Sequence, residues 1–115
     1  MSDQPLKLAV ATKDGMSINL HFGHATRFWV YEVTPNACQL LEQRDVEHYC
    51  HGQHGSQSAM QKILQTINDC HGVFVAMIGE GPTEKLKAIG VKAISDYAHE
   101  AVEASLLDYV RNHSK

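Results

Sequence analysis

Residues Gly72–Ile78 read GVFVAMI and lead directly into Gly79-Glu80-Gly81-Pro82. A short apolar run without polar alternation is typical of a strand that is covered on both faces, as in a parallel α/β sheet. The two glycines predict a tight turn. Pro82 suits the first position of a helix through Ile89, and Gly90 suits its C-terminal cap. We therefore expect a sheet with helices on both faces.

The segments on either side of this unit predict the rest of the fold. Strands are expected at Leu6–Thr12, Phe28–Val33, Cys38–Val46 and Val91–Ile94, and further helices at Ser58–Ile67 and Tyr97–Arg111. The early strands should pair as antiparallel hairpins, whereas the later β-α-β units demand parallel pairing with right-handed crossovers. The prediction is an α/β fold of order β-β-β-α-β-α-β-α with a mixed five-stranded sheet. It forms a single domain, residues 1–115, with frayed tails at 1–5 and 112–115.

Composition excludes several classes of function. The chain has 115 residues, 43% of them apolar, which is enough to bury a core without disulfides or a structural metal. Its formal net charge is −3, so the composition indicates neither the positively charged surface that binds nucleic acid nor a cluster of basic residues that would bind a membrane surface. No apolar run approaches the roughly 20 residues that span a bilayer, and the polar segment Met1–Pro5 lacks the layout of a signal peptide. We expect a cytoplasmic protein that binds neither nucleic acid nor membrane.

Histidine is the compositional outlier, with eight residues in the chain. If the strand at Gly72–Ile78 runs parallel beside the first strand, their carboxyl ends meet at one sheet edge, where open α/β sheets bind ligands. The histidines expected at that edge are His21, His24, His48, His51, His54 and His99. Of the three cysteines, Cys50 is expected there, and Cys38 and Cys70 at the opposite edge.

Two of these segments carry the donor atoms of a metal site. His21-Phe22-Gly23-His24 places two imidazoles three residues apart, and Cys50 adds a thiol beside His51. Thiolate and imidazole together suit zinc or iron–sulfur chemistry; exposed loop histidines are the alternative in both cases. Gly79 and Gly81 precede a helix N-terminus, whose free N–H groups can hold an anion, although an isolated G-x-G is more often an ordinary tight β–α turn.

Signals for catalysis are weak. The sequence contains neither a G-x-S-x-G elbow nor a Walker loop. The strand Leu6–Thr12 has no acidic residue that could hold the magnesium of a nuclease. Cys50 and His51 are sequence neighbours on a loop, and such neighbours rarely form a catalytic dyad. We expect no enzymatic activity, and we expect Met60 and Met77 to fill the core rather than act as ligands.

Nine segments together carry a family resemblance. They are Ala9–Gly15 (AVATKDG), Ile18-Asn19, His21–Ala25 (HFGHA), Tyr31–Val33, Tyr49-Cys50, Asp69–His71, Ile78-Gly79, Asp96–Glu100 and Glu103–Leu107. In this combination the chain resembles the dinitrogenase iron–molybdenum cofactor biosynthesis family, that of NifX, the NafY core domain and the NifB C-terminal domain. The resemblance implies a ribonuclease-H-like fold. It also implies that the chain binds and carries iron–sulfur precursors of the iron–molybdenum cofactor, or the cofactor itself, during nitrogenase assembly.

The resemblance also implies partners and site residues. The partners would be the cofactor synthase and scaffold proteins. The resemblance makes His21 the first candidate ligand and Cys50 the next, with His24 as the third expected metal ligand. The remaining residues expected to contact the cofactor are Asn19, His51, Gly79, Gly81 and His99. The chain has no C-x-x-x-C-x-x-C radical-SAM motif, so synthase chemistry is not expected in it.

Two other functions remain open at this point. One is a protein-interaction module that docks a partner and never holds a cluster. The other is a simple zinc or iron binder with no link to nitrogenase.

Overall fold

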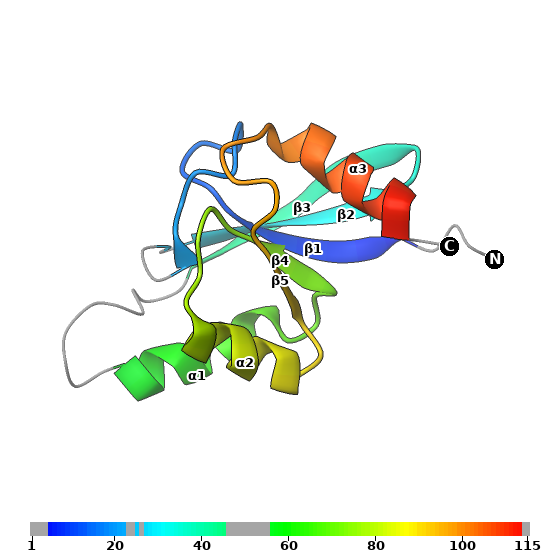
Figure 1. Cartoon of the computed structure of the whole chain (residues 1–115). Coiled ribbons are helices and arrows are strands. Elements are labelled where there is room, and N and C mark those ends of the chain that lie inside the picture. The colour runs from blue at the N-terminus through cyan, green and yellow to red at the C-terminus, as the bar shows by residue number, and fades with distance from the viewer. Residues whose placement is uncertain (1–4, 23–24, 26, 46–55, 114–115) are drawn as a thin grey trace.

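The eight expected elements are all present in the computed structural model, which describes residues 5–22, 25, 27–45 and 56–113. They are β1 (Leu6–Ala11), β2 (Arg27–Thr34), β3 (Ala37–Asp45), α1 (Ser56–Ile67), β4 (Gly72–Phe74), α2 (Glu80–Ala88), β5 (Lys92–Ile94) and α3 (Val102–His113). Their order along the chain is the predicted β-β-β-α-β-α-β-α (Figure 1).

The strands form one five-stranded sheet in the order β3-β2-β1-β4-β5. β1 pairs antiparallel with β2, which pairs antiparallel with β3. β1 pairs parallel with β4, and β4 pairs parallel with β5. The prediction of a mixed sheet is confirmed. The carboxyl ends of β1, β4 and β5 therefore lie at the same edge.

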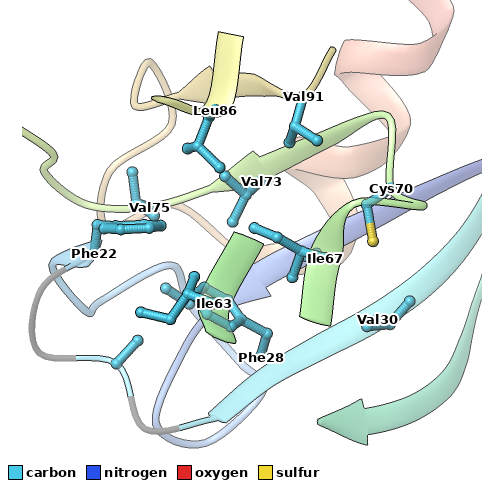
Figure 2. Close-up of a cluster of buried hydrophobic side chains, with 13 residues drawn as sticks. Phe22, Phe28, Val30, Ile63, Ile67, Cys70, Val73, Val75, Leu86 and Val91 are labelled. Atoms are coloured by element: carbon cyan, nitrogen blue, oxygen red, sulfur yellow. The ribbon is translucent and has the colours of Figure 1, made fainter. Parts of the chain in front are cut away.

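Helices cover both faces of the sheet, as predicted: α1 and α2 lie on one face and α3 on the other (Figure 1). Side chains of β1 alternate between the two layers. Ala9 and Ala11 pack in the cluster under α1 and α2, part of which Figure 2 shows. Leu8 and Val10 pack in the cluster under α3. None of the helices in the described part of the chain is long and apolar enough to cross a membrane. The ribonuclease-H-like assignment and the domain limits stay predictions.

The strand expected at Gly72–Ile78 is shorter than predicted, because the chain changes partners after β4. The N–H of Val75 still bonds to the carbonyl of Ile94 at 3.0 Å. The next N–H, of Ala76, donates instead to Leu20 at 2.9 Å. This change carries Met77 to the surface, where 58% of it is exposed. The prediction that Met77 fills the core is wrong.

Two predicted helix starts are also wrong. α2 begins at Glu80, so Pro82 is its third residue; the first four N–H groups of a helix have no acceptor within it, and proline is tolerated there. α3 begins only at Val102, not at Tyr97. The preceding residues pair instead with the loop after β1, since the N–H of His99 donates to the carbonyl of Ile18 at 2.8 Å.

The predicted end of α2 is confirmed. Gly90 has φ +84°, a conformation that L side chains rarely adopt. Its N–H donates to Lys87, and the N–H of Val91 donates to Leu86 at 2.9 Å. This is the Schellman arrangement that ends many helices, and it turns the chain directly into β5.

Candidate functional site

The candidate site lies at the carboxyl edge of the sheet, where three segments meet. They are the loop after β1 (residues 12–22), the link from β4 together with the first two residues of α2 (75–81) and the link from β5 to α3 (95–101). The loop after β1 runs between the other two. It forms an antiparallel bridge from Ser17 to Ala101 on one side and a parallel bridge from His21 to Met77 on the other. The prediction that these three segments share an edge is confirmed.

The start of this loop is held by the side chain of Thr12, which is buried. Its hydroxyl donates to the carbonyl of Ser17 at 2.6 Å and accepts from the N–H of Gly15 at 3.0 Å. Asp14 accepts from the N–H of Met16 at 2.9 Å, and this bond lowers the pKa of the Asp14 carboxyl. Side chains of the loop itself thus fix the turn that leads into the site.

Gly15 is required at this turn for two reasons. Its φ of +77° disfavours any L side chain. A Cβ at this position would also lie 2.3 Å from the ring of Trp29 on β2. The indole therefore packs directly on the backbone of the loop and joins it to the sheet.

Asn19, a predicted cofactor contact, has a structural bond in this loop. Its Oδ1 accepts from the N–H of Lys13 at 3.0 Å, across six residues. The side chain is half-buried. The side chain of Asn19 thus links two parts of the loop after β1. Its contact with a cofactor stays a prediction.

His21 lies at the open surface, but its backbone is well anchored. The neighbouring Phe22 is 1% exposed and packs in the core beside Phe28, with ring centroids 6.1 Å apart (Figure 2). The N–H of Phe22 donates to the carbonyl of Met77 at 2.8 Å. A buried aromatic ring and a main-chain bond therefore present an exposed imidazole at a defined place on the edge.

Gly79 and Gly81 lie at the first turn of α2, which begins three residues after Met77. Gly79 is the N-cap, and its carbonyl accepts from the hydroxyl of Thr83 at 2.7 Å. A Cβ on Gly81 would meet nothing within 4 Å, so this side of the turn is open. The N–H groups of Glu80 and Gly81 have no acceptor within the helix and lie at its positive end, where an anion can bind.

His99 lies on the other flank of the loop. Its backbone has φ +66° and bonds to Ile18, whereas the bridge of His21 runs to Met77. The structure thus pairs His21 with Met77, three residues before α2 begins, and it places His99 on the side that faces α3. Both imidazoles are exposed.

Several predicted site residues lie outside the described residues. They are His24, His48, Cys50, His51 and His54. Of the three predicted metal ligands, the structure therefore describes only His21. Within the described ranges, no group of three or more His, Cys, Asp or Glu side chains is arranged to hold a metal ion.

The other two cysteines lie at the opposite end of the sheet, as predicted. Cys38 pairs with Val33, which pairs with the first residue of β1, and Cys70 lies two residues before the start of β4. Burial raises the pKa of the Cys38 thiol to about 11 and that of the Cys70 thiol to about 12. Because the thiolate is the form that binds metal, a metal would have to displace the proton of either thiol, so both cysteines are weaker ligands near neutral pH than an ordinary cysteine.

Comparison with known families identifies the class of protein to which this arrangement belongs. The sequence profile described as "Dinitrogenase iron-molybdenum cofactor" matches residues 4–112. The chain belongs to this family. The resemblance seen in the sequence motifs is confirmed. The match includes every described segment of the carboxyl edge.

Curated relatives agree with the family match, and a solved structure shares the fold. The chain is 40% identical over 112 residues to the FeMo cofactor biosynthesis protein NifB of Herbaspirillum seropedicae, covering 95% of the chain and 21% of the relative. It is 33% identical to the protein of that name from Azotobacter vinelandii, covering 94% and 22%. The chain thus spans about a fifth of the length of these relatives. The apo orange protein of Desulfovibrio gigas has the same fold, with a TM-score of 0.70 at 18% identity over 98% of this chain and 93% of that one.

Sequence reasoning missed two features of this family member. Met77 stands in register with His21, and Trp29 packs on Gly15. Met77 ends an apolar run, so its sequence context predicts a core side chain and gives no signal of its exposure. The glycine in Lys13-Asp14-Gly15 does signal a turn, but not the aromatic ring that covers it.

Proposed function

We propose that this chain binds iron–sulfur precursors of the iron–molybdenum cofactor, or the cofactor itself, and passes them on during nitrogenase assembly. The observation that carries the proposal is the family match over residues 4–112, together with an anchored, exposed imidazole at the carboxyl edge of the sheet. Relatives at up to 40% identity are named as FeMo cofactor biosynthesis proteins.

The chemistry of the described edge suits temporary binding. A sulfide-rich cluster is large and anionic, and it needs an exchangeable ligand and hydrogen-bond donors. His21 supplies a neutral nitrogen donor of borderline softness. The N–H groups of Glu80 and Gly81 supply donors at the positive end of α2. The two described thiols, which would hold a cluster more firmly, lie at the other end of the sheet, so release stays possible.

The proposal includes partners, location and mechanism. Cargo would be received from the cofactor synthase and passed to scaffold proteins of the cytoplasm. The chain itself would perform no bond-making step beyond ligand exchange. Its residues would anchor one corner of the cluster and leave the rest open to the next protein.

A protein-interaction module is the second candidate, and the geometry of β5 favours it. The N–H of Lys92 and the carbonyl of Ile94 both bond to the β4 side, at 3.1 and 3.0 Å. Since alternate residues of a strand bond to opposite neighbours, the N–H and C=O of Ala93 face the outer edge. A hollow of about 510 Å³ lies there, lined in part by Val91, Tyr97 and Tyr109. An extended segment of a partner could add to this strand.

One experiment separates the two candidates. Apo-protein is mixed anaerobically with isolated iron–molybdenum cofactor and passed through gel filtration, and iron and sulfide are measured in the protein fraction. The carrier proposal predicts that both elute with the protein at micromolar concentration. If they elute with the small molecules instead, the carrier proposal is wrong.

The variant Ala93→Pro provides the complementary arm. It removes the outward N–H at a strand edge, where proline is tolerated. Cofactor loading should stay at the wild-type level, because the substitution lies away from His21. Binding of the synthase or scaffold protein, measured by pull-down, should fall only if β5 is a docking edge.

A further inference from the structure

His21 and Met77 are paired across the edge of the site. They form an isolated parallel bridge, flanked by the bond from Phe22 N–H to the carbonyl of Met77 at 2.8 Å and that from Ala76 N–H to Leu20 at 2.9 Å. Paired residues of neighbouring strands lie about 5 Å apart and point their side chains to the same side. The Cα atoms of His21 and Met77 are therefore close, and their side chains leave the backbone on the same side.

The surrounding side chains show which way this pair faces. Phe22 and Val75 are buried in the cluster under α1 and α2, and Ile78 packs against it. His21 is exposed, and Met77 is 58% exposed. Single exposed apolar residues are common and mean little by themselves. The informative feature is that Met77 stands in register with His21.

We propose that the imidazole of His21 and the thioether of Met77 together bind one soft metal atom at the carboxyl edge. The inference rests on the proposed function, because such an atom would be a corner of the carried cluster. A thioether is a soft, neutral donor that needs no deprotonation, and it selects soft metals over Mg²⁺ or Ca²⁺. With a borderline nitrogen beside it, it gives a two-point contact that is weaker than a thiolate and can exchange.

The chain offers an internal reference for this contact. Met16 is 73% exposed and belongs to the same loop, but it lies on the flank where its carbonyl accepts from Val102 N–H. It has no histidine in register with it among the described residues. Two exposed methionines on one edge thus differ in whether a described histidine stands in register with them.

The test uses silver(I), a soft ion that binds thioether and imidazole, on the whole apo-protein labelled with ¹³C at the methionine methyl groups. The methyl signals are assigned with Met77→Leu and Met16→Leu, which conserve volume. The Met77 signal should shift at a silver concentration about tenfold lower than the Met16 signal, the factor expected from one added donor worth about 1.4 kcal/mol. In His21→Ala the Met77 response should weaken to that of Met16, and Mg²⁺ should shift neither signal.

Equal responses of Met77 and Met16 to silver, or an unchanged Met77 response in His21→Ala, would overturn the proposal that His21 and Met77 bind one metal atom together. The readout needs no cofactor, so its failure is distinct from that of the proposed function. If His21→Ala abolishes cofactor retention but silver binds both methionines alike, the carrier proposal stands and the pair is wrong. If the pair binds silver but the wild type retains no cofactor, the carrier proposal is wrong and the pair stands.

Discussion

The carboxyl edge of the sheet and the corner where α1 leads into β4 are held together in different ways. At the corner, side chains make the links: Asp69 accepts from Lys7 at 3.0 Å and from Arg44 at 2.8 Å, and Arg44 also donates to the carbonyl of Thr66 at 2.6 Å. At the edge, main-chain bonds join the three segments to one another and the buried Phe22 anchors them, whereas the side-chain bonds of Thr12, Asp14 and Asn19 stay within the loop after β1. The difference teaches that contacts between segments at the edge are made by the main chain and by a buried ring, whereas at the corner exposed charged side chains make them as well.

Phe22→Ala should give the largest loss of stability in this comparison. The ring is 1% exposed, and deletion of a buried phenylalanine side chain costs about 3–5 kcal/mol. Urea unfolding measures the change, with Phe22→Leu as the control that keeps a large apolar side chain, which should lose less. A loss below about 1 kcal/mol in Phe22→Ala would show that the edge is not anchored through this ring.

Gly15→Ala should have the next largest effect. The new methyl group would enter the ring of Trp29, and the backbone would keep a φ of +77°. Strain and overpacking together predict a loss of about 1–3 kcal/mol in the free energy of unfolding. Gly81→Ala is the matched control: its Cβ meets nothing within 4 Å and alanine favours a helix, so stability should stay equal or rise. Similar losses in both variants would contradict this account.

Asp69→Asn should cost about 1 kcal/mol, since the carboxylate is partly exposed and its ion pairs are screened. Hydrogen bonds from Arg44, and then from Lys7, hold the pKa of the Asp69 carboxyl well below its usual range. A depressed pKa stabilises the fold above the unfolded pKa of about 3.9, and this contribution is lost as pH falls below it. The stability gap between wild type and Asp69→Asn should therefore narrow between pH 6 and pH 2.5. A gap that is constant over this range would show that the ion pairs contribute nothing.

Cys38→Ser and Cys70→Ser should have the smallest effect on cofactor retention, within about twofold of wild type per folded molecule. Both thiols lie at the far end of the sheet, and burial keeps them protonated near neutral pH. Iron co-eluting with each variant is measured and normalised to folded protein by circular dichroism. A clear loss in either variant would mean that cargo binds at both ends of the sheet.

Most of the fold could be predicted from the sequence, and the errors fall at the site. Apolar runs and turn residues in the sequence predicted β1 to β3 and the parallel position of β4. They did so because burial on one or both faces of a strand produces a regular pattern of apolar residues. The end of β4 and the start of α3 could not be predicted. There the main chain pairs with the loop after β1, so the hydrogen bonds of Ala76 and His99 go to Leu20 and Ile18. Pairing between segments that are distant in the sequence produces no periodic pattern of apolar residues that could be recognised locally.

The candidate site could likewise be predicted only in part. The edge that carries His21, Gly79, Gly81 and His99 follows from the topology of the sheet alone. The separation of His99 from His21 does not, because it depends on which flank of one loop each segment meets. The exposure of Met77 could not be predicted from its apolar neighbours in the sequence. It results from the pairing of this segment with the loop after β1.

Cofactor retention by His21→Ala, compared with His71→Ala, tests the central claim most directly. His71 is exposed and directly precedes β4, at the end of the sheet away from the site. Each variant is loaded anaerobically with isolated iron–molybdenum cofactor, and co-eluting iron is measured per folded molecule. We predict that His71→Ala retains as much iron as wild type. His21→Ala should bind at least about tenfold more weakly, as expected for the loss of one ligand worth about 1.4 kcal/mol or more. Equal retention by the two variants would contradict the assignment of the carboxyl edge as the cofactor site.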